Sequence, residues 1–316
     1  MAESALTGKN EPTHKIMCTS DVDYITVVGA RTDTEFFLRS PGNEYRFINQ
    51  GLRQVKLFPK TTSDLLIQNI LVVFQHGYTA TDIKIINEYT NDLGARIVYV
   101  KSIKEFILFL NQRIEKKRSV KSLVFFSHGL VGFISLRYEG TDENAGVFDK
   151  NSVNQVNKLI FDYDAEIVSY ACRTGIGVDA SSFNNSAEGK PELSLAQYIA
   201  DTWMVTVKAY EKRSSYAKTY GTGSEIKEAE QAKTEIENYD NALKQYTAGK
   251  ALQKPNKPVN YDQNKERLNS IAERTKNSDK TSSGPIMPLG AWHPPTSGDT
   301  PKGLKDGLQT YKPSKK

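Results

Sequence analysis

Short apolar runs rich in Val, Ile and Phe alternate with segments of helical periodicity along this chain, and this alternation constrains the fold more than any other feature. The run from Leu65 to Phe74 is typical of a buried strand. Residues 81–91 follow it with helical spacing of their apolar side chains. Further strands are expected near 96–100, 122–127, 166–171 and 203–209. Repeated β-α-β units with short connections predict an α/β fold, with a mostly parallel sheet and helices on both faces.

Further helices are expected between these strands. Ser102, with Glu105 three positions later, matches the pattern of a helix start. The segment ends in Lys116-Lys117-Arg118, and this basic end suits the helix dipole. Two other helices are expected at 152–161 and 192–201, and a hairpin at 133–138.

Composition divides the rest of the chain. Residues 1–20 lack periodicity and predict a loose N-terminus. Between 21 and 60, short apolar runs alternate with Gly and Pro turns and predict a β-hairpin lead-in to the main sheet. Residues 221–252 are rich in Glu, Lys, Gln and Ala, with a narrow apolar seam that predicts a charged helical arm. Residues 253–316 hold eight of the twelve prolines and predict a Pro/Lys-rich extended tail.

The arm and tail are both expected to make contacts. The seam of the arm has too few large apolar residues to be stable alone. Docking against a second helix near 263–276 is favoured over a dimer interface. Residues 287–295 are apolar enough to dock on the domain.

Composition also limits the partners. The net charge of +5 comes largely from scattered late lysines, whereas nucleic-acid binding needs basic residues clustered on one face, so no nucleic-acid partner is expected. No run reaches the roughly 18 apolar residues of a membrane span, and no membrane association is expected. The N-terminus lacks the pattern of a signal peptide. We therefore expect a cytoplasmic protein as synthesised, with export, if any, by a signal-peptide-independent route.

The cysteine and histidine contents are low. Cys18 and Cys172 are the two cysteines, which excludes a disulfide-rich scaffold, and no bond between them is expected. His14 and His293 fall in expected loops without metal-ligand spacing. No metal and no other cofactor is predicted.

Two of the expected strands end in reactive residues. Residues 123–127 stop at His128-Gly129, and residues 167–171 stop at Cys172. In open α/β sheets, chemistry sits at the carboxyl ends of the strands. If the two strands are neighbours, a thiol and an imidazole face one crevice as a Cys-His catalytic pair. The backbone N–H of Gly129 suits an oxyanion donor, because a residue without a Cβ allows close approach of a carbonyl group.

The motif around the cysteine reads Tyr170-Ala171-Cys172-Arg173-Thr174-Gly175, and His128 precedes Cys172 by 44 residues. Over about residues 65–210, this order of motifs resembles the caspase-like (clan CD) cysteine peptidases, in the manner of a bacterial relative. The resemblance implies a caspase-like three-layer sandwich over 21–220 and peptide-bond hydrolysis by Cys172 and His128. It also implies an oxyanion hole formed by the backbone N–H groups of Gly129 and Cys172.

The same resemblance implies a substrate pocket near the end of the first main strand. Gln75, His76 and Asp82 are candidates for its wall, together with Arg173 after the cysteine. His76-Gly77 also ends a strand, so His76 is a rival base and equally a turn residue. Specificity stays open at this point: Arg173 and Arg137 would suit acidic substrates, and Asp82 and Asp179 would suit basic ones.

The sequence lacks the motifs of two other kinds of active or binding site. No Gly-x-Ser-x-Gly elbow occurs, and Gly175-Ile176-Gly177 lacks the third glycine of a dinucleotide site. The competitor is a non-catalytic caspase-like interaction module that binds a protein through its arm and tail. For the peptidase, the partners are a protein or peptide substrate and a regulatory or secretion partner bound through residues 221–316. Self-cleavage is expected within 175–190 or 211–260, and a bacterial effector or toxin is the expected setting.

Overall fold

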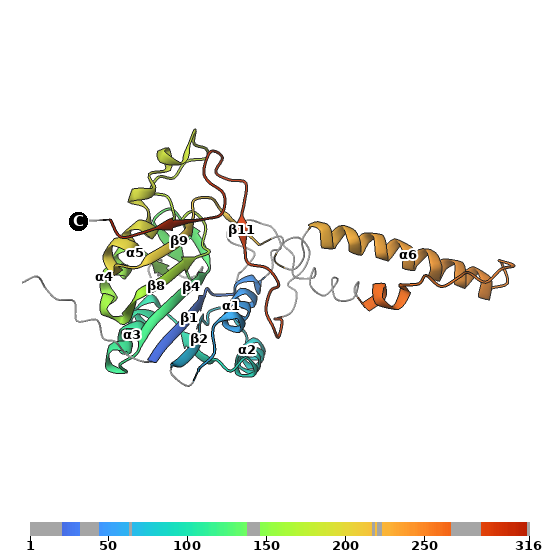
Figure 1. Ribbon diagram of the computed structural model, residues 1–316, viewed down its shortest axis with the longest axis horizontal. Coiled ribbons are helices and arrows are strands. Elements are labelled where there is room, and N and C mark those ends of the chain that lie inside the picture. The colour runs from blue at the N-terminus through green and yellow to red at the C-terminus, as the bar shows by residue number, and fades with distance from the viewer. Residues whose placement is uncertain are drawn as a thin grey trace, which may run out of the picture.

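The computed structural model describes residues 21–31, 44–62, 65–137, 146–216, 219, 223–266 and 286–314. They form an α/β domain from which a helical arm projects (Figure 1). Within these ranges, no helix is long and apolar enough to cross a membrane. The loose N-terminus expected over residues 1–20 lies outside the described residues.

A seven-stranded sheet forms the centre of the domain. Its strands are β1 (Asp21–Val28), β2 (Leu66–Phe74), β3 (Arg96–Val100), β4 (Ser119–Phe126), β8 (Phe161–Ser169), β9 (Thr206–Tyr210) and β12 (Leu308–Tyr311). Their order is β12-β9-β8-β4-β1-β2-β3. All neighbours are parallel except β12, which runs antiparallel to β9. The predicted α/β class with a mostly parallel sheet is confirmed.

Helices cover both faces of the sheet, so the domain has three layers (Figure 1). One face carries α1 (Arg46–Leu57) and α2 (Ala80–Asp92), and the other carries α3 (Ile103–Glu115), α4 (Lys150–Gln155) and α5 (Leu195–Trp203). Alternate side chains of each strand serve the two faces. On β4, Leu123 and Phe125 belong to the core beneath α3, whereas Val124 and Phe126 belong to the core beneath α1.

The predicted strands and most of the predicted helices are present. The strands expected near 66–75, 96–100, 122–127, 166–171 and 203–209 correspond to β2, β3, β4, β8 and β9. The first and last of the predicted helices between them correspond to α2 and α5, and the helix that begins after Ser102 is α3. The helix expected at 152–161 is replaced by α4 and the short 3-10 helix η1 (Lys158–Ile160), because β8 already begins at Phe161. Two more 3-10 helices, η2 (Ser186–Gly189) and η3 (Pro191–Leu193), precede α5.

The hairpin lead-in predicted for residues 21–60 is wrong. β1 lies inside the central sheet, between β4 and β2. The segment from Arg46 onward is the helix α1, whose buried side chains include Ile48, Leu52 and Val55. Gly51, interpreted as a turn, lies within this helix. A Cβ at Gly51 would come within 2.5 Å of Val28, so glycine allows α1 to pack directly on the sheet.

The extended tail predicted for residues 253–316 is wrong for residues 286–311. β12 is a strand of the central sheet, and β11 (Thr296–Ser297) pairs with β10 (Ser214–Ser215). The chain before β11 docks on α1. The N–H of Met287 donates to Asn49 Oδ1 (2.8 Å), and the N–H of Ala291 donates to the Asn49 carbonyl (2.8 Å). The expected docking of the apolar patch 287–295 is therefore confirmed.

The arm consists of α6 (Gly223–Thr247) and the chain that returns along it. Residues 261–266 are helical. The Tyr261 ring lies 5.1 Å from the Tyr239 ring, and the Tyr261 hydroxyl donates to Asp240 (2.7 Å). These contacts agree with the expected docking of a second helix near 263–276, of which the part after residue 266 lies outside the described residues.

A small antiparallel sheet follows β4 directly. It consists of β5 (His128–Leu130), β6 (Phe133–Ser135) and β7 (Val147–Phe148). The hairpin predicted at 133–138 thus starts earlier, with His128 opposite Ser135. This pairing fixes the backbone of His128 and Gly129 just beyond the carboxyl end of β4.

Candidate active site

The strand order reverses between β1 and β4, since β2 and β3 lie on one side of β1 and β4, β8 and β9 on the other. In open α/β sheets, the carboxyl ends of the strands at such a reversal border a crevice that binds ligands. The loops after these strands meet there. The N–H of Gly29 donates to the Phe126 carbonyl (2.9 Å), and the N–H of Arg31 donates to the His76 carbonyl (3.1 Å). The topology therefore points to the edge at which β1, β4 and β8 end.

His128 and Cys172 lie at this edge. They follow β4 and β8, which are neighbouring parallel strands. The N–H of Tyr170 donates to the Phe125 carbonyl (3.0 Å) and keeps the two strand ends in register. Gly129 packs so closely on the cysteine that a Cβ at this position would lie 2.8 Å from the Cys172 nitrogen. The predicted adjacency of the strands that precede His128 and Cys172 is confirmed, and the approach of the two side chains to within a few ångströms stays a prediction.

Cys172 is partly exposed and sits in a tight turn. The next residue, Arg173, has a left-handed backbone conformation (φ 56°), and its N–H donates to the Lys212 carbonyl (3.0 Å). The N–H of Ser214 donates to Cys172 Sγ (3.2 Å), and the Ser214 hydroxyl lies 3.2 Å from the same atom. The turn therefore holds the sulfur against β10.

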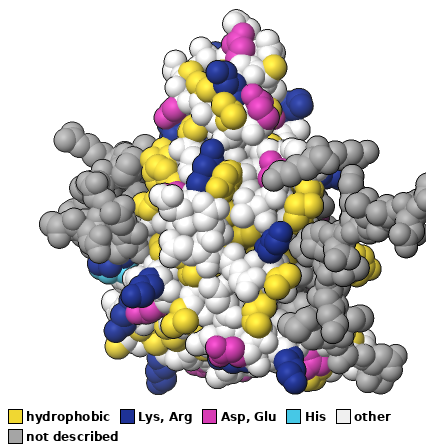
Figure 2. All heavy atoms as spheres, turned by 90° about the vertical axis from the view of Figure 1, so that its left-hand side faces the viewer, with side chains coloured by type: hydrophobic (Ala, Val, Ile, Leu, Met, Phe, Trp, Pro, Cys, Tyr) yellow, Lys and Arg dark blue, Asp and Glu magenta, His cyan; other side chains and the backbone are white. Residues whose placement is uncertain are grey.

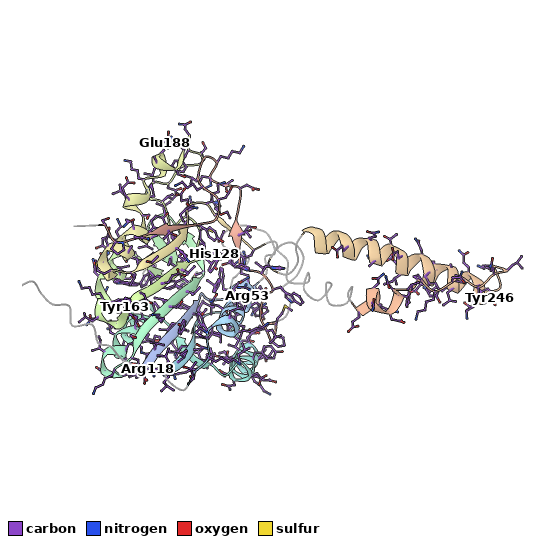
Figure 3. The ribbon with its side chains drawn as sticks, viewed as in Figure 1. Arg53, Arg118, His128, Tyr163, Glu188 and Tyr246 are labelled. Carbon is purple, nitrogen blue, oxygen red and sulfur yellow. The ribbon has the colours of Figure 1, made fainter. Side chains whose placement is uncertain are left out.

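His128 is packed against α1. Its ring meets the Phe47 ring edge-on, with the centroids 4.8 Å apart. Burial, and after it the positive charge of Arg46, lower the pKa of His128 well below its usual value of 6.5. The imidazole is therefore neutral near pH 7 and able to accept a proton. Figure 3 shows His128 and Arg53 of α1 on the arm side of the domain, with Arg118 at the far end of the sheet.

Tyr216 is a site residue that the sequence did not indicate. Its ring lies 5.6 Å from the Phe47 ring, and the Arg46 guanidinium lies 5.9 Å from its centroid. Burial, and next the charge of Cys172, raise the pKa of Tyr216 well above its usual range. Its hydroxyl is buried and has no hydrogen-bond partner among the described residues. A tyrosine within an expected loop carries no sequence signal for this placement.

Asp82, a candidate for the pocket wall, has a structural role at the start of α2. Its carboxylate accepts the N–H of Thr79 (2.8 Å) in a capping box at the start of α2. It also accepts the hydroxyl of Tyr45 (2.9 Å), and Arg31 Nη1 lies 3.7 Å away. Asp82 is only 6% exposed. Its carboxylate therefore serves the start of the helix and a local ion pair.

Gln75 and His76 follow β2 and are partly exposed. β2 is separated from β8 by β1 and β4, three strand spacings of about 4.8 Å each, or roughly 14 Å in all. His128 follows the strand next to β8. It is therefore better placed than His76 to act on Cys172.

Two of the charged residues considered for opposite specificities, Arg173 and Asp179, pair with each other. Arg173 is buried, and its Nη1 donates to the Asp179 carboxylate. Arg137 is partly buried after β6, and its Nε has no hydrogen-bond partner within the described part of the chain. Arg173 therefore supports the turn that carries Cys172, and its charge is opposed by Asp179.

In the described ranges, no group of three or more His, Cys, Asp or Glu side chains could hold a metal ion. Comparison of the chain with protein-family models, with curated proteins and with solved structures finds no match. The assignment of a function therefore depends on the geometry of the site.

Proposed function

We propose that this protein is a cysteine peptidase with a caspase-like sandwich, in which Cys172 is the nucleophile and His128 the general acid/base. One observation carries the proposal. His128-Gly129 and Cys172 follow adjacent parallel strands, and Gly129 packs on the cysteine backbone. A lone buried cysteine is commonly structural. A thiol and a neutral imidazole at one sheet edge, however, are the pair that acyl transfer needs.

The reaction begins with proton transfer from the Cys172 thiol to the neutral imidazole of His128. The thiolate attacks the carbonyl carbon of the scissile bond, and the backbone N–H groups of Gly129 and Cys172 stabilise the oxyanion. The imidazolium then protonates the leaving amine, which leaves an acyl thioester on Cys172. Water, deprotonated by His128, hydrolyses the thioester and regenerates the thiol.

Hydrolysis of a fluorogenic peptide library tests this proposal. We expect Cys172→Ala to abolish cleavage and His128→Ala to lower kcat/KM by about 10²-fold or more, as for loss of a general base. His76→Ala is the matched control at the end of β2 and should retain activity. Full activity in Cys172→Ala, or equal losses in the two histidine variants, would contradict the dyad. The same profile decides between acidic and basic residues at the cleavage site.

Self-cleavage is part of the same proposal. Hydrogen bonding and burial favour the connection after α6 over the 175–190 loop as the cleaved segment. The 175–190 loop is closed, because the N–H of Gly177 donates to the Gly189 carbonyl (2.8 Å) and Ile176 is fully buried. The connection after α6 carries exposed Lys250 and Lys254. In the same experiment, mass spectrometry of incubated protein should find fragments that end in this connection for the wild type, and none for Cys172→Ala.

The second candidate function is binding of a regulatory or secretion partner through the arm. The arm projects from the domain (Figure 1), and Leu252 and Val259, in the chain that follows α6, are fully exposed. Residues 286–311 belong to the domain, so this candidate is limited to the arm. For a non-catalytic interaction module, Cys172→Ala would leave partner binding intact and the peptide library would detect no hydrolysis in the wild type.

A further inference from the structure

Among the described residues, Ser214 makes both hydrogen-bond contacts of the Cys172 sulfur. Its N–H donates to the sulfur (3.2 Å), and its hydroxyl lies 3.2 Å away, where it can accept from the thiol or donate to the thiolate. Donors aimed at a sulfur atom favour the thiolate, because they stabilise negative charge. We propose that Ser214 is a positioning residue that stabilises the Cys172 thiolate, and that the C-terminal segment 286–300 holds Ser214 in place. The proposal rests on the proposed role of Cys172 as the nucleophile.

The thiolate needs such donors because His128 is uncharged at rest. In many cysteine enzymes, a protonated histidine beside the sulfur lowers the thiol pKa. Here burial and the charge of Arg46 lower the pKa of His128, so the imidazole is neutral near pH 7 and offers no fixed positive charge. The N–H and hydroxyl of Ser214 are in contact with the sulfur before any proton moves, and they stabilise the negative charge as it forms.

The pairing of β10 with β11 directs the Ser214 N–H toward the sulfur. Arg213, the preceding residue, directs both backbone groups to the C-terminal segment. Its N–H donates to the Thr300 carbonyl (2.7 Å), and its carbonyl accepts the N–H of Gly298 (2.7 Å). Because successive residues of a strand direct their backbone groups to opposite sides, the N–H of Ser214 faces away from β11. On that side it meets Cys172.

The same segment also binds α1, the helix that packs against His128. The carbonyl of Thr219, just after β10, accepts the N–H groups of Trp292 and His293 (3.0 Å each). Gln50 of α1 donates to the His293 carbonyl (2.9 Å). α1 carries Phe47, which packs on His128. One segment far along the chain therefore holds both β10 and the helix behind the histidine.

The pH dependence of Cys172 alkylation by iodoacetamide tests the role of Ser214, in a Cys18→Ser background where Cys172 is the remaining thiol. We expect Ser214→Ala to raise the midpoint of the alkylation profile by about one pH unit, since it removes one donor to a charged group. Ser214→Thr keeps the hydroxyl and should restore the midpoint. Ser215→Ala, the adjacent control on the same strand, should leave it unchanged.

Gly298→Pro tests the role of the C-terminal segment. Proline lacks the N–H that bonds the Arg213 carbonyl, so we expect the midpoint to rise as in Ser214→Ala, with the domain still folded by thermal unfolding. An unchanged midpoint in Ser214→Ala, or equal shifts in Ser214→Ala and Ser215→Ala, would overturn the proposal for Ser214. An unchanged midpoint in a folded Gly298→Pro variant would overturn the proposal for the segment.

Alkylation needs no peptide substrate, so its result is separable from that of the peptidase assay. If the midpoint of the alkylation profile depends on Ser214 but the protein cleaves no peptide, the proposed peptidase activity is overturned. The proposed effect of Ser214 on the Cys172 thiolate would still stand. If the protein hydrolyses peptides through Cys172 but the alkylation midpoint is independent of Ser214, the peptidase proposal stands and the proposed role of Ser214 is overturned.

Discussion

At the scale of single residues, the buried hydroxyl of Tyr216 is the clearest unsatisfied polar group near the proposed dyad. The side chain is 5% exposed, and its hydroxyl has no hydrogen-bond partner among the described residues. A buried polar group without a partner destabilises a fold by about 1–3 kcal/mol. Local conflicts of this kind concentrate at functional sites. Tyr216 packs on Phe47, which in turn packs on His128, so we interpret its hydroxyl as a polar group that the fold retains for the function of this site.

This interpretation predicts opposite effects on stability and activity. Tyr216→Phe should raise the free energy of unfolding by about 1 kcal/mol, since it removes an unsatisfied group, and should lower kcat/KM. Tyr210→Phe is the matched control, because the Tyr210 hydroxyl donates to the Pro295 carbonyl (2.6 Å) and its removal should destabilise the fold. Urea unfolding and peptide hydrolysis measure the two quantities. A Tyr216→Phe variant that is less stable, or equally active, would exclude a functional role of the Tyr216 hydroxyl.

His128 predicts a pH dependence of stability. Its pKa is lowered in the folded state, so below the usual value near 6.5 the unfolded chain binds a proton that the buried imidazole does not. The free energy of unfolding should therefore decrease as the pH falls below about 6.5, by at most about 1.4 kcal/mol per pH unit from this group. His128→Gln should flatten the slope below about pH 6.5. Equal slopes in the wild type and His128→Gln would contradict the lowered pKa of this imidazole.

At the scale of secondary-structure elements, the sequence predicted what depends on short-range pattern. The strands that end just before His128 and Cys172 finish in apolar runs bounded by polar or turn residues, and a run buried on both faces has few alternatives to a parallel strand. The cap at Ser102 likewise depends on residues three apart, and its hydroxyl accepts the N–H of Glu105 (3.2 Å). Both reactive residues could therefore be placed from the sequence.

α1 shows where pattern alone was insufficient. The segment Tyr45 to Ile48, at and just before its start, contains enough aromatic and β-branched residues to indicate a strand, and Gly51 indicates a turn. In the structure, the glycine is the point at which the helix approaches Val28 and Leu71, where a Cβ would lie within 2.5 and 2.9 Å of their side chains. Gly51 is therefore required for packing between distant segments, although in the sequence it resembles a turn residue.

Ser214 and the C-terminal segment were missed for the same reason. Ser214 lies 42 residues from Cys172 in sequence, and β11 lies still further along the chain. A two-residue pairing between polar segments leaves no periodic pattern. Prolines around it suggested an extended tail, whereas here they belong to a docked segment in which Pro295 is buried and its carbonyl accepts the Tyr210 hydroxyl. Contacts of this length are set by the fold as a whole.

At the scale of the whole molecule, the domain consists of chain segments before and after the arm, so the arm is an insertion within the domain. The described charges on the face in Figure 2 are dispersed, with basic and acidic side chains among apolar and uncharged ones. The arm differs in this respect. From residue 225 to 240 it has six acidic residues and two lysines, whereas residues 241–261 have four lysines and no acid. The far end of the arm is therefore basic, and one of its four lysines, Lys257, is paired with Asp262 (2.7 Å).

The insertion predicts that the arm can be removed and the C-terminal segment cannot. Thr219 and Trp292 are hydrogen-bonded on the domain (3.0 Å), so replacing residues 222–285 by a short Gly-Ser linker should leave the thermal midpoint and kcat/KM within about twofold of the wild type. Truncation after residue 285 should instead unfold the domain or inactivate it. It removes β11 and β12 with the buried side chains Ile286, Leu304 and Tyr311, each of which contributes about 1.5–3 kcal/mol on burial.

Thermal unfolding and peptide hydrolysis on the two deletion variants distinguish these outcomes. The Tyr311 hydroxyl donates to the Gly175 carbonyl (2.7 Å) in the turn that follows Cys172, so loss of β12 should also disturb the nucleophile. Tyr311→Phe separates this contact from the loss of the strand, and we expect it to lower kcat/KM while the domain stays folded. Unfolding after removal of the arm, or a stable and active protein after truncation at residue 285, would show that the division between domain and arm is wrong.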